Sequence, residues 1–172
     1  MPGEGRRMMG INKEHASPCG LHCGVCAILM AHRDNNVKFK ERLVQVYSGN
    51  IPGKGTLPGT ENFSVDDIRC EGCLSEDRFM HCQQCDIRDC VEEKGIEGCH
   101  ECDDFPCAFI EEFPMTIGRK VILRAVPERR EKGTEQWMQD ELDRYLCPDC
   151  GHKLFRGAGR CNQCGISVDL DG

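Results

Sequence analysis

The pattern of apolar positions predicts helices along most of the chain. Between residues 25 and 47, apolar side chains recur every three or four residues, which is the spacing of one helix face. We expect either one helix or a broken pair there, ending at Gly49 and followed by a loop over residues 50–60, which are rich in proline and glycine. The apolar positions are Val25, Ile28, Leu29, Val37, Leu43, Val44 and Tyr47.

Shorter helices are predicted between the cysteines that follow. Ser64 and Asp67 resemble a capping box that opens a short turn. The segment Asp86–Lys94 is expected to form a helix, because its polar and apolar positions fit a helix and Gly95 is a typical residue just past a helix end.

Two more helices are expected before residue 133. Asp104 is a suitable cap for a helix over 105–113, since proline is tolerated in the first turn. A further helix is expected from about residue 116 to 126, with a restart near Pro127 and a stop at Gly133.

A last helix is predicted to follow. Thr134 can cap a helix that runs to Leu146, and Trp137, the single tryptophan, is expected to pack the helices onto the cysteine-rich part. No alternation of polar and apolar residues typical of a strand occurs before residue 147.

The composition shows that apolar burial alone is a small source of stability. The chain has 172 residues and 15 cysteines, and its hydrophobic fraction of 39% includes those cysteines. A chain this poor in aliphatic and aromatic side chains cannot bury a generous core. The cysteines are the only residues numerous enough to supply the missing stability.

The cysteine spacing predicts metal binding. The number of cysteines is odd, and twelve of them form six C-x2-C pairs, the spacing at which two thiolates of one turn meet a single ion. A thioredoxin-type pair needs a βαβ scaffold, which the pattern lacks. The chain shows neither a secretory signal nor a run of about 20 apolar residues that could span a membrane. We therefore expect a cytoplasmic protein with reduced thiols.

The distribution of cysteines divides the chain into four segments. We expect a flexible arm over residues 1–17, a cysteine-rich metal-binding domain over 18–113, a helical connector over 114–146, and a zinc ribbon with an acidic tail over 147–172. The expected fold class is mainly α, a small cysteine-rich domain stapled by metal and with irregular loops, plus a C-terminal β-hairpin zinc ribbon.

The C-terminal unit has the pattern of a zinc ribbon. Two C-x2-C pairs stand ten residues apart, and Gly151 and Gly165 follow them, where a left-handed backbone can turn amides toward the thiolates. Residues 153–156 are expected to form one strand of a hairpin that turns at 157–159. Four thiolates leave no open position for a substrate, so we expect a structural zinc ion. Its ligands would be Cys147, Cys150, Cys161 and Cys164.

The other eleven cysteines stand in a recognisable order. They form the strings Cys19-Gly20-Leu21 with Cys23 and Cys26, Cys70-Glu71-Gly72-Cys73, Cys82 with Cys85, Ile87 and Cys90, and Cys99 with Cys102, Phe105, Pro106 and Cys107. This order resembles the DUF3795 family of uncharacterised bacterial and archaeal proteins, over about residues 17–112. The resemblance implies metal binding and little more about function.

Eleven thiols are too few for three four-thiolate sites and too many for two. The simplest partition has two complete sets, Cys70, Cys73, Cys82 and Cys85, and Cys90, Cys99, Cys102 and Cys107. Cys19, Cys23 and Cys26 then need a fourth ligand. The alternatives are an open position, a distant cysteine, or one of His22, His32, His81 and His100. Spacing allows exchanges between all these sets.

The identity of the metal in residues 19–107 stays open. Zinc and iron–sulfur clusters take the same thiolate ligands, and zinc is favoured because the ribbon beside this region already has a zinc pattern. Cys19, Cys23 and Cys26 have the spacing of a radical-SAM cluster, but the chain lacks the length and alternating elements of that barrel. If the protein does chemistry at a metal, we expect it at this triplet.

Charge is distributed unevenly along the chain. Residues 86–112 carry a formal charge of −8, and residues 113–133 carry +4, within a total of −7. We expect the basic helix to dock on the acidic, thiolate-rich part. The alternative is contact with an unknown protein partner or nucleic acid through weak basic patches at 119–132 and 153–160.

Signatures of the common enzyme classes are missing from the sequence. It contains no phosphate-binding loop, no G-x-S-x-G and no H-E-x-x-H motif. We expect a multi-site metal-binding protein that is a non-catalytic module rather than an enzyme. It would contact a protein or nucleic-acid partner, with no membrane contact and no evident small-molecule substrate. The alternative is an iron–sulfur protein in electron transfer or redox sensing.

Overall fold

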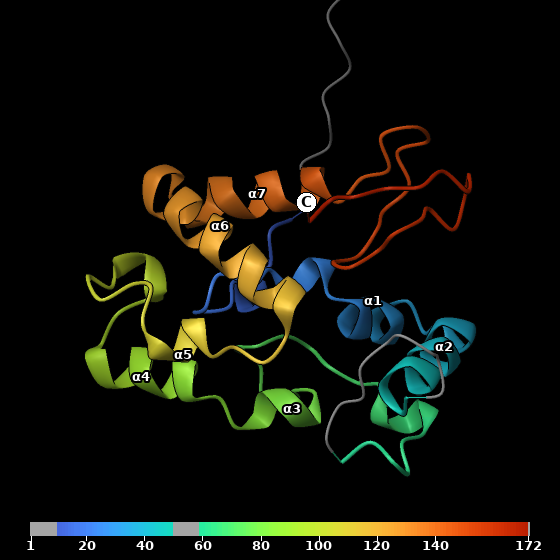
Figure 1. The fold of residues 1–172 in the computed structure, drawn as a ribbon, viewed down its shortest axis with the longest axis horizontal. Coiled ribbons are helices and arrows are strands. Elements are labelled where there is room, and N and C mark those ends of the chain that lie inside the picture. The colour runs from blue at the N-terminus through green and yellow to red at the C-terminus, as the bar shows by residue number, and fades with distance from the viewer. Residues whose placement is uncertain (1–9, 50–58, 172) are drawn as a thin grey trace, which may run out of the picture.

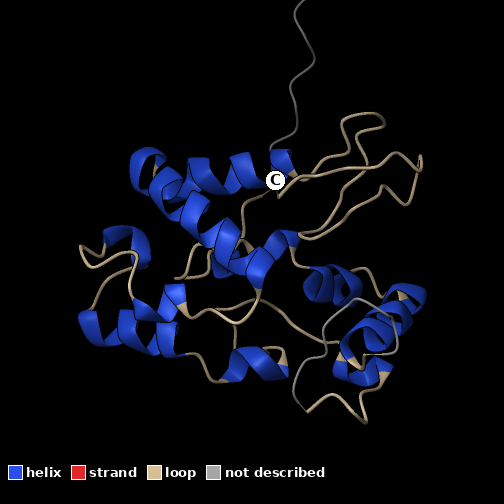
Figure 2. Cartoon of the chain, in the orientation of Figure 1, coloured by secondary structure: helices blue, strands red, loops and turns tan. Residues whose placement is uncertain are grey.

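The structure is a computed structural model that describes residues 10–49 and 59–171. Helices α6 and α7 lie side by side along one side of the molecule, with α4 and α5 beneath one end and α1 and α2 at the opposite end (Figure 1). The described residues are mainly helical, as predicted (Figure 2). None of their helices has the length and apolar character needed to cross a membrane. Most of the predicted loop over residues 50–60, and residues 1–9, lie outside the described ranges.

The segment over residues 25–47 is a broken pair of helices, one of the two arrangements expected. Helix α1 spans Ala27–Arg33 and α2 spans Val37–Tyr47. The break lies at Asn35, whose φ of 46° is left-handed. Asn36 then caps α2, because its Oδ1 atom accepts the amide of the residue three positions on at 3.0 Å.

Short helices connect α2 to α6. The predicted capping box of Ser64 and Asp67 opens the 3₁₀ helix η3, Val65–Asp67. Helix α4 spans Asp86–Lys94 and ends at the left-handed Gly95, as predicted. Two more short helices in this stretch are α3 (Met80–Gln83) and η4 (Cys99–Glu101), and the 3₁₀ helices η1 (Lys13–His15) and η2 (Cys23–Val25) precede α1.

The helix predicted over residues 105–113 is shorter in the structure. Helix α5 spans only Ala108–Glu111 and has Cys107 as its N-terminal flanking residue. The carboxylate of Asp104 does not cap α5, because it forms an ion pair with Lys94 Nζ at 2.7 Å. The capping prediction is therefore wrong, since this side chain has a charged partner on α4.

Helix α6 spans Thr116–Lys132 and runs through Pro127 without the predicted restart. A proline removes one hydrogen bond of the helix, to the carbonyl four residues earlier. That residue is Leu123, whose side chain is exposed, so water can reach this side of the helix. Helix α7 spans Thr134–Arg144. Thr134 does not cap it, because its Oγ1 atom donates to Glu97 Oε1 at 2.8 Å.

The single tryptophan joins the helical connector to the cysteine-rich part, as predicted. Trp137 is fully buried, and its ring centroid lies 5.8 Å from that of His22. Arg129 of α6 lies over the same indole ring. The core cluster around this tryptophan contains Ala16, Val121, Ala125 and Met138.

The predicted β-hairpin of the C-terminal unit is wrong, because the described residues contain no strand there. The amide of Leu154 donates to Tyr145 O at 2.7 Å, and that of Arg156 donates to Val25 O at 2.8 Å. These two amides therefore cannot form the hydrogen bonds that would join the strands of the predicted hairpin. Two isolated antiparallel bridges remain, Leu146 with Lys153 and Arg160 with Ser167.

Candidate metal centres

The structure brings together the four thiols of the C-terminal four-cysteine unit. Their Sγ atoms all lie within 4.8 Å of one another. The separation is 3.6 Å between Cys147 and Cys164 and 3.7 Å between Cys150 and Cys161. A tetrahedral ion with Zn–S bonds of about 2.3 Å holds its sulfurs about 3.8 Å apart. The unit therefore has the ligand set and the spacing of a site for a single metal ion.

Two turns of the same construction present these thiols. The Gly151 amide donates to Cys147 O at 2.9 Å, and the Gly165 amide donates to Cys161 O at 3.0 Å. The φ angles of the two glycines are 71° and 80°, as the sequence predicts. A residue with a Cβ atom adopts this conformation only at a cost, which explains why glycine follows each pair.

Backbone amides stabilise a thiolate within the unit. The Gln163 amide lies 3.4 Å from Cys161 Sγ. Amide hydrogen bonds from Cys164 and Gln163 lower the pKa of Cys161 to about 6. The thiolate is the form of cysteine that binds metal, so this turn is prepared for an ion.

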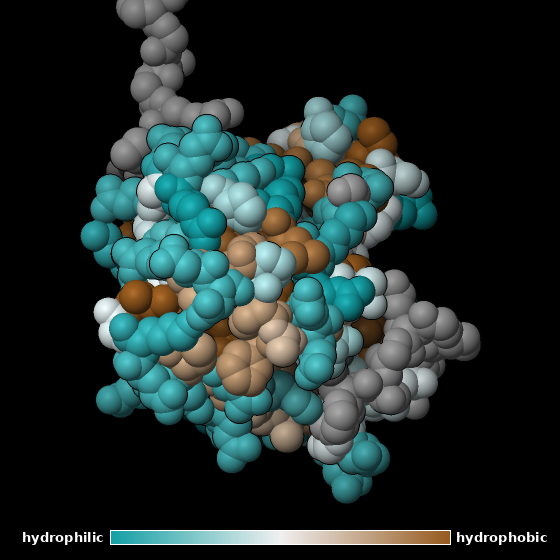
Figure 3. Space-filling view, turned by 60° about the vertical axis from the view of Figure 1, so that its left-hand side comes forward, coloured by the Kyte–Doolittle hydropathy of each residue, from teal (hydrophilic) through white to brown (hydrophobic). Residues whose placement is uncertain are grey.

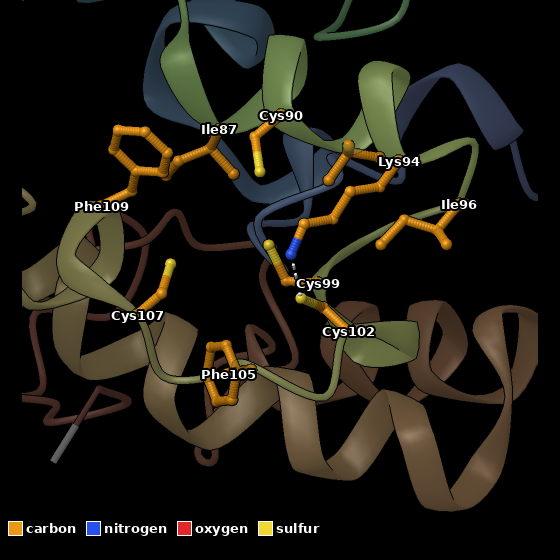
Figure 4. A pocket seen from close by; sticks show the side chains of 10 residues that line it. Ile87, Cys90, Lys94, Ile96, Cys99, Cys102, Phe105, Cys107 and Phe109 are labelled. Carbon is orange, nitrogen blue, oxygen red and sulfur yellow. Dashed lines mark hydrogen bonds between the residues drawn. The ribbon is translucent and has the colours of Figure 1, made fainter.

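Four further cysteines line one cavity, and we refer to Cys90, Cys99, Cys102 and Cys107 as the cavity group. They are the four residues of the second set in the predicted partition. Their side chains come from α4, from the η4 turn and from the residue before α5 (Figure 4). Apart from Lys94, the rest of the lining is apolar: Ile87, Val91, Ile96, Phe105 and Phe109.

Burial and the neighbouring thiols affect the pKa of one member of the cavity group, Cys99. Burial, followed by the three other thiols of the group, raises the pKa of Cys99 to about 11. The ammonium group of Lys94 donates to Cys102 Sγ at 3.2 Å and to Asp104 at 2.7 Å. Thiolates that line the same cavity repel one another, and a bound cation would offset that repulsion.

A second set of thiols gathers where the segment before α1 meets the loop before α3. We refer to it as the central thiol group: Cys23, Cys26, Cys70, Cys73 and Cys82. The Cys73 amide lies 3.3 Å from Cys23 Sγ, and Cys26 packs against the core cluster that contains Cys70. Cys82 is exposed as a residue, yet burial of its thiol, followed by the four other thiols, raises its pKa to about 12.

Two arginines lie beside the central thiol group. The buried Arg88 donates to Cys82 O at 2.9 Å and approaches Cys73 Sγ at 4.0 Å. Arg156, from the C-terminal four-cysteine unit, donates to His22 O at 3.4 Å, and the nearby Cys26 thiol favours its charged form. Buried cations beside thiols favour the thiolate form.

Cys19 and Cys85 lie between the two groups. Burial raises the pKa of Cys19, and the thiols of Cys73 and Cys85 add to this rise. Cys19 also shares a core cluster with Cys99, against which Cys85 packs. The sequence predicted a separate set of Cys70, Cys73, Cys82 and Cys85. In the structure this set is not separate, because Cys85 lies beside thiols that do not belong to it.

The structure gives His22 a role other than that of a fourth ligand for the Cys19, Cys23 and Cys26 triplet. Its Nδ1 atom accepts the Gly24 amide at 2.8 Å, and its ring packs against Trp137. Within residues 10–49 and 59–171, no histidine nitrogen lies within 4.8 Å of two cysteine sulfurs that are also this close to each other. The other histidines considered as ligands, His32, His81 and His100, therefore also lack such a pair of sulfurs.

One group without cysteine was not predicted. Ligand atoms of Glu97, His100 and Glu101 lie within 4.8 Å of one another. However, Glu97 Oε1 already binds Arg129 at 2.9 Å, and Glu101 Oε2 accepts the Glu97 amide at 2.7 Å. These carboxylates are therefore part of the packing between η4 and α6.

Sequence reasoning also missed the basic residues beside the thiols. Lys94 follows Cys90 by four residues on a predicted helix, so the shared helix face could have indicated its position. Arg88 and Arg156 gave no such signal, because their contacts depend on how distant segments pack.

Most basic side chains of residues 119–132 bind within the molecule, in line with the docking interpretation. Arg119 donates to Glu111 O at 2.9 Å, and Arg130 donates to His100 O at 2.8 Å. Lys132 instead pairs with Asp140 of α7, at 2.7 Å. The basic helix α6 is thus attached to the acidic, cysteine-rich part.

Comparison with known protein families identifies the N-terminal part of the chain. A family model described as a protein of unknown function, DUF3795, matches residues 15–112, which is more than half of the chain. The chain belongs to the DUF3795 family. The region matched by DUF3795 contains both the cavity group and the central thiol group, and the C-terminal four-cysteine unit lies outside it. No curated protein and no solved structure matches the chain.

Proposed function

We propose that this DUF3795 protein is a non-catalytic, multi-site metal-binding protein whose C-terminal four-cysteine unit is a zinc ribbon. The observation that carries the proposal is the arrangement of the four sulfurs, with separations of 3.6 and 3.7 Å. Four protein thiolates fill every position of a tetrahedral zinc ion, so the site has no place for a substrate. The ion in the ribbon is structural.

The cavity group and the central thiol group bind metal as well in this proposal. Eleven thiols, most of them partly or fully buried, gather within one region of the chain. Lys94, Arg88 and Arg156 supply positive charge beside them. Thiolate sites persist in a reducing compartment, so the proposal includes a cytoplasmic location.

The proposal also includes a protein partner in preference to nucleic acid. Arg119, Arg129 and Arg130 bind backbone carbonyls of the same chain, which leaves a small basic surface for phosphates. The face shown in Figure 3 carries hydrophobic side chains between hydrophilic ones. The exposed apolar residues of α5, α6 and the segment between them are Phe109, Met115, Ile117 and Leu123.

A second candidate function is electron transfer or redox sensing by an iron–sulfur cluster. One observation favours it: the sulfurs of the cavity group surround a cavity and do not meet at one point. The cavity group would then hold iron and sulfide, whereas the C-terminal four-cysteine unit would hold zinc.

Elemental analysis of the anaerobically purified chain tests the proposed function. We expect zinc in the wild-type protein, and one zinc ion fewer per chain in the variant Cys147→Ala/Cys161→Ala. The matched control is Gly159→Ala, in the same unit, where an added Cβ meets nothing within 4 Å. This control should keep the full zinc content. A wild-type protein without metal, or equal zinc in all three proteins, contradicts the zinc ribbon.

A binding measurement tests the choice of partner. Fluorescence anisotropy with single-stranded RNA and with duplex DNA, at low salt, should show no binding at micromolar protein. Binding that weakens steeply with added salt would contradict this choice, because it would show that the protein neutralises phosphates.

A further inference from the structure

The sulfurs of the cavity group are arranged differently from those of the ribbon. In the ribbon, all four sulfurs lie within 4.8 Å of one another. Among the eleven cysteines from Cys19 to Cys107, all of which are described, no three sulfurs lie this close together. Cys99 and Cys102 reach the cavity side by side from the η4 turn, whereas Cys90 reaches it from α4 and Cys107 from the residue before α5 (Figure 4).

The spacing of thiolates depends on what they bind. A single zinc ion needs sulfurs about 3.8 Å apart, as found in the ribbon. An iron–sulfur cluster needs a wider set, on the order of 6 Å for a cubane, because iron and sulfide atoms separate the thiolates. A four-cysteine set that surrounds a cavity therefore fits a cluster better than one ion.

The surroundings of the cavity group also fit a cluster. Ile87, Val91, Ile96, Phe105 and Phe109 supply an apolar lining. Lys94 contributes the charged hydrogen bond to Cys102 Sγ, at 3.2 Å. Hydrogen bonds to the sulfurs and nearby positive charge are among the features by which proteins set the reduction potential of a cluster.

We propose that the cavity group binds an iron–sulfur cluster through Cys90, Cys99, Cys102 and Cys107, with Lys94 as a residue that raises its reduction potential. The inference rests on the part of the proposed function that assigns metal to these thiols, and it names the metal at this site. The chain then carries two kinds of metal centre, a structural zinc ion and a redox-active cluster.

Metal analysis of variants at each site tests the assignment. Wild-type protein, purified without oxygen, should contain iron and acid-labile sulfide in equal amounts and should show a charge-transfer band in the visible spectrum. The variant Cys90→Ala/Cys107→Ala should lose that iron, sulfide and band and keep the ribbon zinc. The variant Cys147→Ala/Cys161→Ala should show the reverse. Alanine is used because a serine hydroxyl can remain a ligand.

The retained metal shows that each variant is folded at the other site. A wild-type protein with zinc at every site overturns the cluster and leaves the proposed function intact. Iron that stays at the wild-type level in Cys90→Ala/Cys107→Ala overturns the assignment to this cavity. A chain without any metal overturns the inference and the proposed function together.

A potential measurement tests Lys94 separately. Lys94→Met should lower the midpoint reduction potential at unchanged iron content, because the variant lacks a positive charge and a hydrogen bond at the thiolate. Lys94→Arg should restore most of the shift. A potential that is the same in Lys94→Met and wild-type protein would overturn this role.

Discussion

The guanidinium group of Arg129 lies over the indole ring of Trp137, with Cζ 5.0 Å from the ring centroid, and both residues are buried. The same group donates to Ser17 O at 3.0 Å and pairs with Glu97 Oε1 at 2.9 Å. Ser17 lies two residues before Cys19, the first ligand candidate. One buried cation therefore joins α6, α7 and the beginning of the cysteine-rich part.

Replacement of Arg129 by methionine should lower the free energy of unfolding by about 3 kcal/mol, because it leaves Ser17 O and Glu97 without their charged partner. Chemical denaturation of the metal-loaded protein measures this change. Glu97→Gln is the matched control and should cost less than about 1 kcal/mol, since the Glu97 side chain is 56% exposed. Equal losses in the two variants would contradict the central role of the cation.

Removal of metal should unfold the helices. Among residues 10–49 and 59–171, the buried core forms four small clusters, three of which include cysteines. Structural zinc in small modules contributes on the order of 10 kcal/mol, more than such clusters can replace. We expect a strong chelator to abolish the helical circular dichroism and added zinc, or iron and sulfide, to restore it. Helicity that persists in metal-free protein would refute this dependence.

The sequence predicts well what depends on neighbouring residues. Helix α4 and its end at Gly95 follow from a local pattern and a left-handed glycine, and both are confirmed. The turns at Gly151 and Gly165 are confirmed for the same reason. In each case the deciding interactions lie within a few residues of one another.

Features that depend on distant contacts were predicted poorly. Asp104 pairs with Lys94 of α4, so it does not begin a helix. The amide of Arg156 bonds to Val25, which removes the expected hairpin. The cavity group itself could be proposed as a set of four, but spacing alone could not distinguish it from the other partitions.

Gly98 should resist substitution, because it lies at the beginning of the η4 turn that carries Cys99. An added Cβ atom would lie 2.9 Å from Pro18 O and 3.1 Å from Arg129 Nη1. We expect Gly98→Ala to lower the free energy of unfolding by about 1–3 kcal/mol. Gly159→Ala meets nothing within 4 Å and should change it by less than about 0.5 kcal/mol. Thermal or chemical denaturation of the two variants gives the comparison.

His22→Gln should leave the metal content unchanged. The structure assigns its Nδ1 atom to the Gly24 amide at 2.8 Å, and no pair of sulfurs lies around the ring within the described residues. Elemental analysis decides the point, with Cys23→Ala as the comparison that should lose metal. Loss of one ion per chain in His22→Gln would restore the histidine as the fourth ligand of the Cys19, Cys23 and Cys26 triplet.

Arg156 should slow the release of metal from the central thiol group. It is one of two basic residues beside these thiols, and thiolates raise its pKa against the effect of burial. Arg156→Met removes a positive charge that favours thiolates, so a colorimetric chelator should extract metal from the variant several-fold faster than from wild-type protein. Arg160→Met is the matched control, because Arg160 is exposed and its Nε atom donates to Gly165 O at 2.7 Å. Faster release in both variants would show that a loosened ribbon, and not the charge beside the central thiol group, controls the rate.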